Sequence, residues 1–156
     1  GFFDMTWQAG VANVDAQGRF VDGRGIATGD LNGDGYADLV YANRTYNPSQ
    51  SSPLAQEVGI PRVWLSTERE GHWLRIRVES EKGNRQGLGT MVWVDNGERE
   101  TAYGLGLGGG TNSSSERVLT IGLGDADTVD LRIRFRDGEE VELTDVAANQ
   151  ELVVSQ

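Results

Sequence analysis

An acidic nine-residue loop, Asp30–Asp38, constrains the fold of this chain more than any other feature of its sequence. Oxygen-bearing side chains stand at loop positions 1, 3, 5 and 9, and a glycine stands at position 6. This spacing is typical of a loop that wraps once around a hard cation, with the glycine allowing a sharp bend between ligands. Three carboxylates so close together repel one another unless a cation neutralises them. The sequence therefore predicts a Ca²⁺ site with side-chain ligands Asp30, Asn32, Asp34 and Asp38 and the backbone oxygen of Tyr36.

The acidic loop does not follow the EF-hand pattern. Position 12, where an EF-hand needs a bidentate glutamate, is Tyr41. The flanking residues 25–29 and 39–42 are small or β-branched, which favours strands over helices. Calcium is favoured over magnesium, because magnesium demands a tight octahedron and keeps its waters. An alternative is a turn whose aspartates only cap backbone amides; four oxygen side chains in register with the glycine favour the metal.

Short β-branched runs separated by tight turns predict an all-β fold. The chain has 22 glycines, three prolines and no cysteine, so thiolate chemistry is excluded. We expect a calcium-loop segment over residues 1–66 and an antiparallel β-sandwich over residues 67–156.

The second half of the chain has the clearest strand pattern. Residues 73–78 alternate between polar or aromatic and aliphatic side chains, and Asn96-Gly97 is a strong hairpin signal. An extended loop is expected over residues 43–61, with a helical turn at 54–58. The other expected strands cover residues 2–7, 11–14, 25–28, 38–41, 62–65, 90–95, 100–105, 117–121, 129–135, 140–143 and 151–154.

The charge of the chain limits its partners. Its net charge is −10 and its pI is near 4.5. Nucleic acid is disfavoured as a partner, because phosphate binding needs a clustered basic surface. No apolar stretch approaches the roughly 20 residues that span a bilayer, so no membrane span is expected.

Two parts of the sequence resemble known families. Residues 25–39 resemble the FG-GAP/VCBS repeat, the calcium-binding unit of integrin-like β-propellers, and residues 3–11 look like the opening of one such blade. From His72 onward the chain is similar to the ASPIC/UnbV domain. The pieces that carry this second resemblance are residues 72–76, 84–89, 108–110, 121–124, 129–131 and 136–138.

The resemblance implies the C-terminal part of a CRTAC-like secreted protein, located outside the cell or at its surface, with no established catalytic role. It also implies that the calcium-loop segment is a single propeller-blade-like unit, whereas a propeller needs several blades to bury its faces. Two kinds of partner could cover the faces of a single blade. One is a set of preceding propeller blades. The other is copies of this chain, added head to tail by strand addition that uses the open edge or the apolar strand at residues 1–7.

The expected function is a non-enzymatic, extracellular, calcium-stabilised structural or adhesion module, with a self-assembling subunit of a surface appendage or fibre as one form. The alternative is a glycan-binding module that uses arginine-bearing strand faces or its tryptophans. His72 is the only histidine, and no nucleophile motif accompanies it. Asn43 and Asn112 begin N-glycosylation patterns. The tryptophans are Trp7, Trp64, Trp73 and Trp93.

Overall fold

The computed structural model describes residues 3–14, 18, 21, 23–44, 60–67, 70–106 and 113–156. This part of the chain contains ten strands and no helix, which confirms the all-β prediction. No membrane-crossing helix is found among these residues. The strands are β1 (Gly23–Gly29), β2 (Asp38–Asn43), β3 (Arg62–Trp64), β4 (His72–Glu79), β5 (Met91–Asp95), β6 (Glu100–Gly104), β7 (Leu119–Gly124), β8 (Thr128–Arg134), β9 (Glu140–Ala147) and β10 (Gln150–Ser155).

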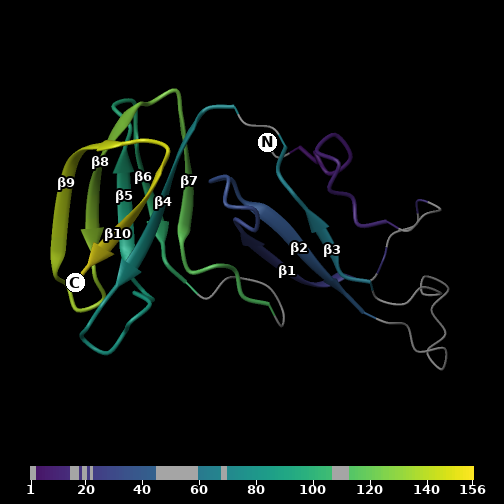
Figure 1. The fold of residues 1–156 in the computed structure, drawn as a ribbon, viewed down its shortest axis with the longest axis horizontal. Helices are drawn as coiled ribbons and strands as arrows, with labels where there is room; N and C mark the ends of the chain where they lie inside the picture. Colours follow the sequence, from purple (N-terminus) through teal and green to yellow (C-terminus); the bar gives the residue numbers. More distant parts are fainter. Residues whose placement is uncertain are drawn as a thin grey trace.

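The first three strands form a small antiparallel sheet in the order β1-β2-β3, which we call the N-terminal sheet (Figure 1). β1 and β2 make a hairpin in which Gly29 pairs with Asp38, so the acidic loop is the connection between them. Among the residues that the structure describes, β3 pairs only with β2, through Leu39 and Trp64 among others, and it is one edge of the sheet.

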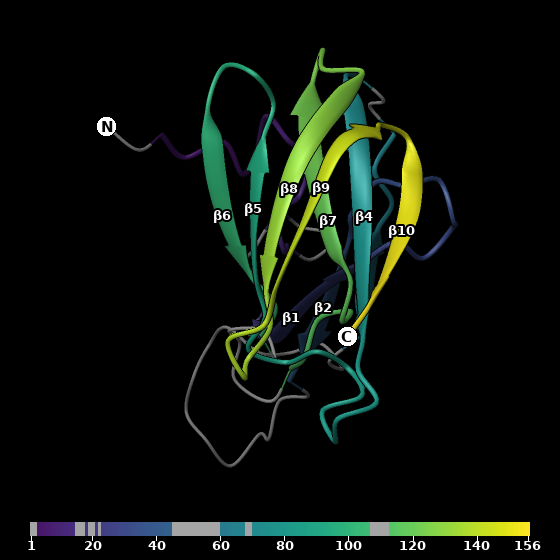
Figure 2. The same ribbon diagram turned by 90° about the vertical axis from the view of Figure 1, so that its left-hand side faces the viewer.

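The remaining seven strands form two facing sheets, β10-β4-β7 and β6-β5-β8-β9, which we call the sandwich (Figure 2). The prediction of an antiparallel sandwich is right except for one pair, because β10 runs parallel to β4. The chain crosses from one sheet to the other in the turn after β9. There Asn149, with a φ of 60°, donates its amide to the carbonyl oxygen of Trp73 at 2.6 Å. This crossing brings β10 alongside β4 in the same direction.

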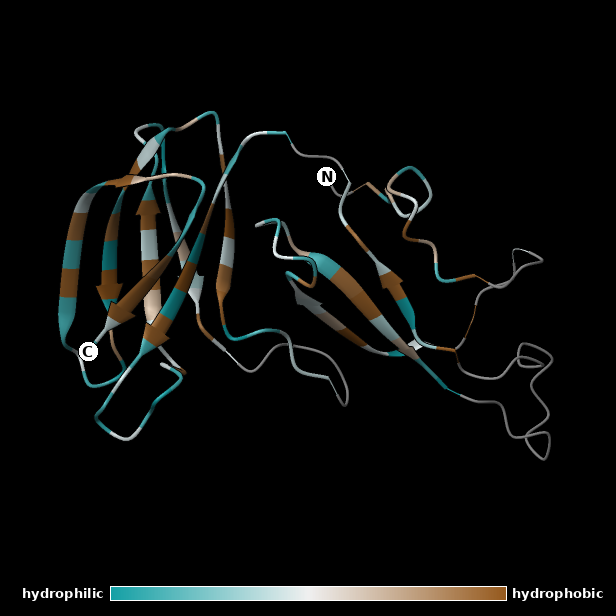
Figure 3. Cartoon of the chain, in the orientation of Figure 1, coloured by the Kyte–Doolittle hydropathy of each residue, from teal (hydrophilic) through white to brown (hydrophobic). Residues whose placement is uncertain are grey.

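The sandwich holds the hydrophobic core. Successive residues of a strand face opposite sides of a sheet, so the alternating apolar residues gather between the two sheets, as the banding of β8 and β9 shows (Figure 3). All fourteen buried hydrophobic residues of the described chain lie between Leu74 and Val154. Leu74, Ile76, Val92 and Ile133 are completely inaccessible to solvent. The N-terminal sheet adds none to this set.

The start of the chain differs from the prediction. The expected strand at residues 2–7 is wrong over its described residues, 3–7, none of which is in a strand. The carbonyl oxygen of Met5 accepts a hydrogen bond from the amide of Ala9 at 2.8 Å in a turn. The carboxylate of Asp4 accepts the amide of Thr6 at 2.9 Å, a local bond that favours a turn over a strand. Residues 11–14 contribute one isolated bridge at Val14. The expected helical turn at 54–58 lies outside the described residues.

Candidate metal loop

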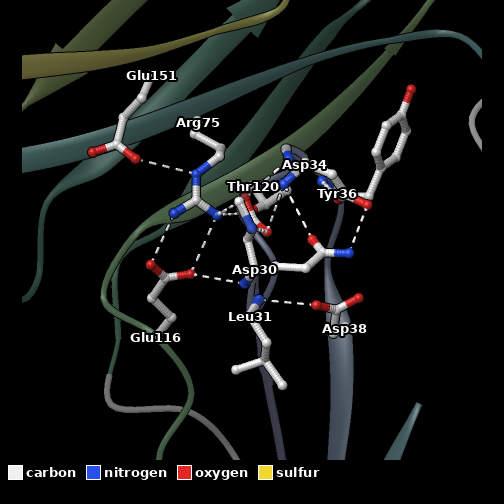
Figure 4. A network of polar contacts seen from close by, with 12 residues as sticks. Asp30, Leu31, Asp34, Tyr36, Asp38, Arg75, Glu116, Thr120 and Glu151 are labelled. Carbon is white, nitrogen blue, oxygen red and sulfur yellow. Dashed lines mark hydrogen bonds and ion pairs between the residues drawn. The ribbon is translucent and has the colours of Figure 1, made fainter. Parts of the chain in front are cut away.

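The acidic loop is organised by the carboxylate of Asp30 at its start (Figure 4). One oxygen, Oδ1, accepts hydrogen bonds from the backbone amides of Gly33 at 2.7 Å and Asp34 at 3.1 Å. The other, Oδ2, accepts the amide of Gly35 at 2.9 Å. Three amides that a tight bend would otherwise leave unpaired are therefore satisfied by one side chain.

The carboxylate of Asp38 closes the loop from its other end. Asp38 is only 1% exposed. Its Oδ2 accepts the amide of Leu31 at 2.8 Å, and its Oδ1 accepts the amide of Ser66 at 2.8 Å. Asp38 thus ties the start of the acidic loop to its end and to the segment that follows β3.

The middle of the loop brings the remaining predicted ligands together. Asn32 accepts the amide of Asp34 at 3.1 Å through Oδ1 and donates through Nδ2 to the Asp34 carboxylate at 2.9 Å. Asp34 Oδ1 in turn accepts the amide of Tyr36 at 3.0 Å. The side chains of Asn32 and Asp34 therefore point toward each other across the loop.

The donor chemistry of this loop fits a hard cation, because every predicted ligand atom is a carboxylate, amide or backbone oxygen. Within the described ranges, however, no three His, Cys, Asp or Glu side chains converge in a way that would hold a metal ion. Asp30 and Asp38 direct their oxygens at backbone amides. A cation would have to share these oxygens, so the calcium site stays a prediction.

The acidic loop packs against the outer face of β4. A Cβ atom built on Gly35 would lie 2.1, 2.3 and 2.6 Å from three ring atoms of Trp73, and Gly35 has a φ of +90°. The hydroxyl of Tyr36 donates to the carbonyl oxygen of Gly71 at 3.2 Å. The glycine at position 6 therefore meets two demands, the bend of the loop and close contact with an indole ring.

A second strip of contacts runs beside this one, between β1 and the segment before β7. The backbone amide of Glu116 donates to the carbonyl oxygen of Thr28 at 2.9 Å. The hydroxyl of Ser115 accepts the amide of Thr28 at 3.1 Å, and the carboxylate of Glu116 accepts the amide of Asp30 at 3.1 Å. These bonds join the N-terminal sheet to the sandwich at the root of the acidic loop.

Arg75 of β4 lies where the two regions meet and is only 6% exposed. Its guanidinium nitrogens lie 2.8 Å from Glu116, 3.2 Å from Glu151 and 3.4 Å from Asp30. Burial by itself would lower the pKa of Arg75, but hydrogen bonds to Glu116 and Glu151 outweigh it and raise this pKa above its ordinary value. One buried cation thus joins carboxylates from the acidic loop, the segment before β7, and β10.

The alternation over residues 73–78 predicts that Trp73 and Arg75 lie on one face of a strand, and the alternative function used such an arginine-bearing face to bind glycan. The structure brings this face against the acidic loop instead. Trp73, a tryptophan on the polar side of an amphipathic strand, was the one feature of the sequence that indicated a packed face. Nothing in the sequence identifies Ser115 or Glu116 as partners, because they come 87 and 86 positions after Thr28 and Asp30, the residues whose amides they accept.

The other arginine-bearing face is also engaged within the protein. The guanidinium carbon of Arg132 lies 4.0 Å from the ring centroid of Trp93, and that of Arg134 lies at 5.1 Å. Arg132 is also 3.5 Å from the carboxylate of Glu100 across the sheet. The guanidinium of Arg132 therefore covers a Trp93 ring face on which a sugar could otherwise stack.

The predicted glycosylation positions have different outcomes. Asn43 donates its side-chain amide to the carbonyl oxygen of Ile60 at 2.8 Å, and its Oδ1 accepts the side chain of Asn13 at 2.8 Å. A glycan on Asn43 would replace these bonds. Asn112 lies outside the described residues.

Comparison with known families gives two matches along the chain. The model of the FG-GAP repeat matches residues 23–52, a range that includes the acidic loop. The model described as ASPIC and UnbV matches residues 80–156, which hold most of the sandwich. The comparison with curated proteins gave no match.

Proposed function

Because the chain carries an FG-GAP repeat followed by an ASPIC and UnbV domain, we propose that it is a non-enzymatic, calcium-stabilised structural or adhesion module. FG-GAP repeats are typical of extracellular or surface proteins, and both domains indicate an extracellular β-rich module. Secretion, adhesion and calcium binding are parts of our proposal.

One observation supports this proposal above the others: the acidic loop lies at the junction of the two regions. Gly35 packs on Trp73, and Asp30 reaches Arg75. A calcium ion bound by Asp30, Asn32, Asp34, Asp38 and the Tyr36 backbone oxygen would neutralise carboxylates that otherwise repel. Stiffening this loop would therefore hold the N-terminal sheet in place on the sandwich, which is a structural role.

Loss of calcium is the experiment that tests the proposal. Extracellular calcium modules have Kd values of about 10⁻⁴ to 10⁻³ M. At about 10 mM calcium such a site contributes about 1.4 to 2.7 kcal/mol, or about 3 to 10 °C in melting temperature for a chain of this size. We expect the protein to melt lower in excess chelator by that amount, and Asp34→Asn to shrink the difference. Equal melting temperatures with and without calcium would contradict a structural ion.

The surface of the N-terminal region supports a partner for this module. Of the nine large hydrophobic residues that are exposed in the described chain, eight lie in its first 65 residues. Ile60, Val63 and Leu65, which are 62%, 55% and 51% exposed, lie on or next to the edge strand β3. Such a surface suits preceding propeller blades or a second copy of the chain.

Sizing and electron microscopy distinguish these partners. A chain that adds to itself forms oligomers or fibres whose amount rises with concentration, and Val63→Glu lowers it. A chain that needs preceding blades stays monomeric at all concentrations and gains stability only when those blades are supplied. The glycan alternative has weaker support, since Trp73 packs under Gly35 and Arg132 covers Trp93.

A further inference from the structure

Arg75 is placed between carboxylates that belong to different regions of the protein. Glu116 and Glu151 are contributed by the sandwich, whereas Asp30 is contributed by the acidic loop. The Arg75 side chain is 7% exposed and that of Asp30 is 5% exposed, so water screens this contact weakly. Asp30 is the residue whose carboxylate accepts three loop amides.

The contact uses the oxygen that a cation in the loop would also need. Arg75 lies 3.4 Å from Asp30 Oδ2, and the same oxygen accepts the amide of Gly35. A guanidinium neutralises part of the charge of the acidic loop without any metal. It also repels a divalent cation that approaches the same carboxylate, because two like charges a few ångströms apart interact unfavourably at low exposure.

We propose that Arg75 is a built-in counter-cation of the acidic loop, which stabilises the loop without an ion and weakens its affinity for a divalent cation. The inference rests on the proposed function, since it concerns the same calcium site. It assigns to the sandwich a part in setting how tightly the FG-GAP loop binds its ion. The ion and the arginine then act on one carboxylate in opposite directions.

The chain provides a matched control in Arg77, two residues further along β4. Arg77 forms an ion pair with Glu151 at 2.8 Å, the same carboxylate that Arg75 uses, and its side chain is 41% exposed. Its ion pair is with the sandwich rather than with the acidic loop. Replacing Arg77 therefore removes one positive charge from the same strand and disturbs Glu151, but leaves the Arg75–Asp30 contact in place.

The test is a calorimetric titration of the chain with calcium chloride at low salt, together with thermal melts in chelator and in saturating calcium. We expect Arg75→Met to bind calcium about tenfold more tightly than the wild type. We also expect it to melt lower in chelator, since its carboxylate partners lose their cation. The calcium-induced rise in melting temperature should therefore be larger than in the wild type. Arg75→Lys, which keeps the charge, should bind nearly as weakly as the wild type, and Arg77→Met should change the Kd by less than about twofold.

Two outcomes would overturn the inference, and they differ. If the wild type binds calcium and Arg75→Met binds it equally or more weakly, Arg75 is only a structural link and the inference alone is wrong. If neither protein binds calcium, the proposed function fails as well. Should Arg75→Met not fold in chelator, Arg75→Gln is titrated in its place; it removes the charge while keeping an amide donor for Glu116, and the same tighter binding is expected.

Discussion

The sandwich and the N-terminal region differ in how many of their hydrophobic side chains they bury. The sandwich encloses a cluster of thirteen buried hydrophobic residues. The N-terminal sheet contributes none of the buried hydrophobic residues in the described chain. Conversely, of the nine large hydrophobic residues that are exposed in the described part of the chain, eight lie in the N-terminal region and one, Val153, belongs to the sandwich. The sandwich therefore has a core of its own, whereas the N-terminal sheet depends on what covers it.

Polar contacts, rather than buried hydrophobic side chains, hold the N-terminal region in place. Asp30 and Asp38 satisfy loop amides, and Arg75 and Glu116 tie the loop to the sandwich. Contacts of this kind fix a position well but contribute modestly to stability, because each replaces hydrogen bonds to water. The difference between the regions shows that an FG-GAP unit can be placed by its loop while its apolar surface stays available.

The largest expected effect is the loss of a buried side chain from the sandwich. Ile133 is completely buried, so Ile133→Ala should lower the free energy of unfolding by about 3 to 4 kcal/mol through lost burial and the cavity left behind. Val63→Ala on the N-terminal sheet should cost no more than about 0.5 kcal/mol, because Val63 is 55% exposed. Chemical denaturation measures both. Similar losses at the two positions would mean that the regions share one core in solution.

The two regions also differ in how well the sequence predicted their strands. β4, β5 and β8 were predicted within one or two residues, because alternating side chains on a half-buried strand give a period of two that needs no knowledge of the partner. The parallel pairing of β10 with β4 was missed, since it depends on where the chain crosses between sheets. The strand expected at residues 2–7 failed because Asp4 caps a turn locally.

For the candidate site, the sequence predicted which residues of one short loop belong to it, but not the distant residues that this loop contacts. The five residues proposed as ligands lie in one loop because their spacing is short and their glycine permits the bend. The docking of that loop on Trp73 and Arg75 depends on contacts between residues about 40 positions apart. The alternation of residues predicted which side chains share a face of the strand, but it could not predict which part of the protein packs on that face.

A pair of glycine substitutions tests whether the acidic loop is docked. Gly33 and Gly35 both have positive φ values, +75° and +90°, so alanine is strained at either position by about 1 kcal/mol. A Cβ at Gly33 meets nothing within 4 Å, whereas at Gly35 it meets the Trp73 ring at 2.1 Å. We expect Gly33→Ala to cost about 1 kcal/mol and Gly35→Ala about 2 to 3 kcal/mol in thermal unfolding. Equal costs would show that Trp73 does not contact the loop.

The smallest expected effect concerns the outer face of the sandwich and appears as a dependence on pH. Hydrogen bonds from Arg77 and Arg75 lower the pKa of Glu151 below its ordinary value of 4.5, although partial burial opposes this. A lowered pKa in the folded state means that ionised Glu151 stabilises the protein above about pH 4.5, and that this stability is lost as the pH falls through the folded pKa.

Glu151→Gln removes this titration while keeping a side chain of the same size. We expect the wild type to lose more stability than the variant between about pH 5 and pH 3, and the two to converge at the acid end. The difference at neutral pH should be small, since the Glu151 side chain is 34% exposed and solvent screens its ion pairs. Melting curves at each pH measure it. If the difference is as large as that for Ile133→Ala, then polar contacts on this face contribute as much as the core, and the contrast between the two regions fails.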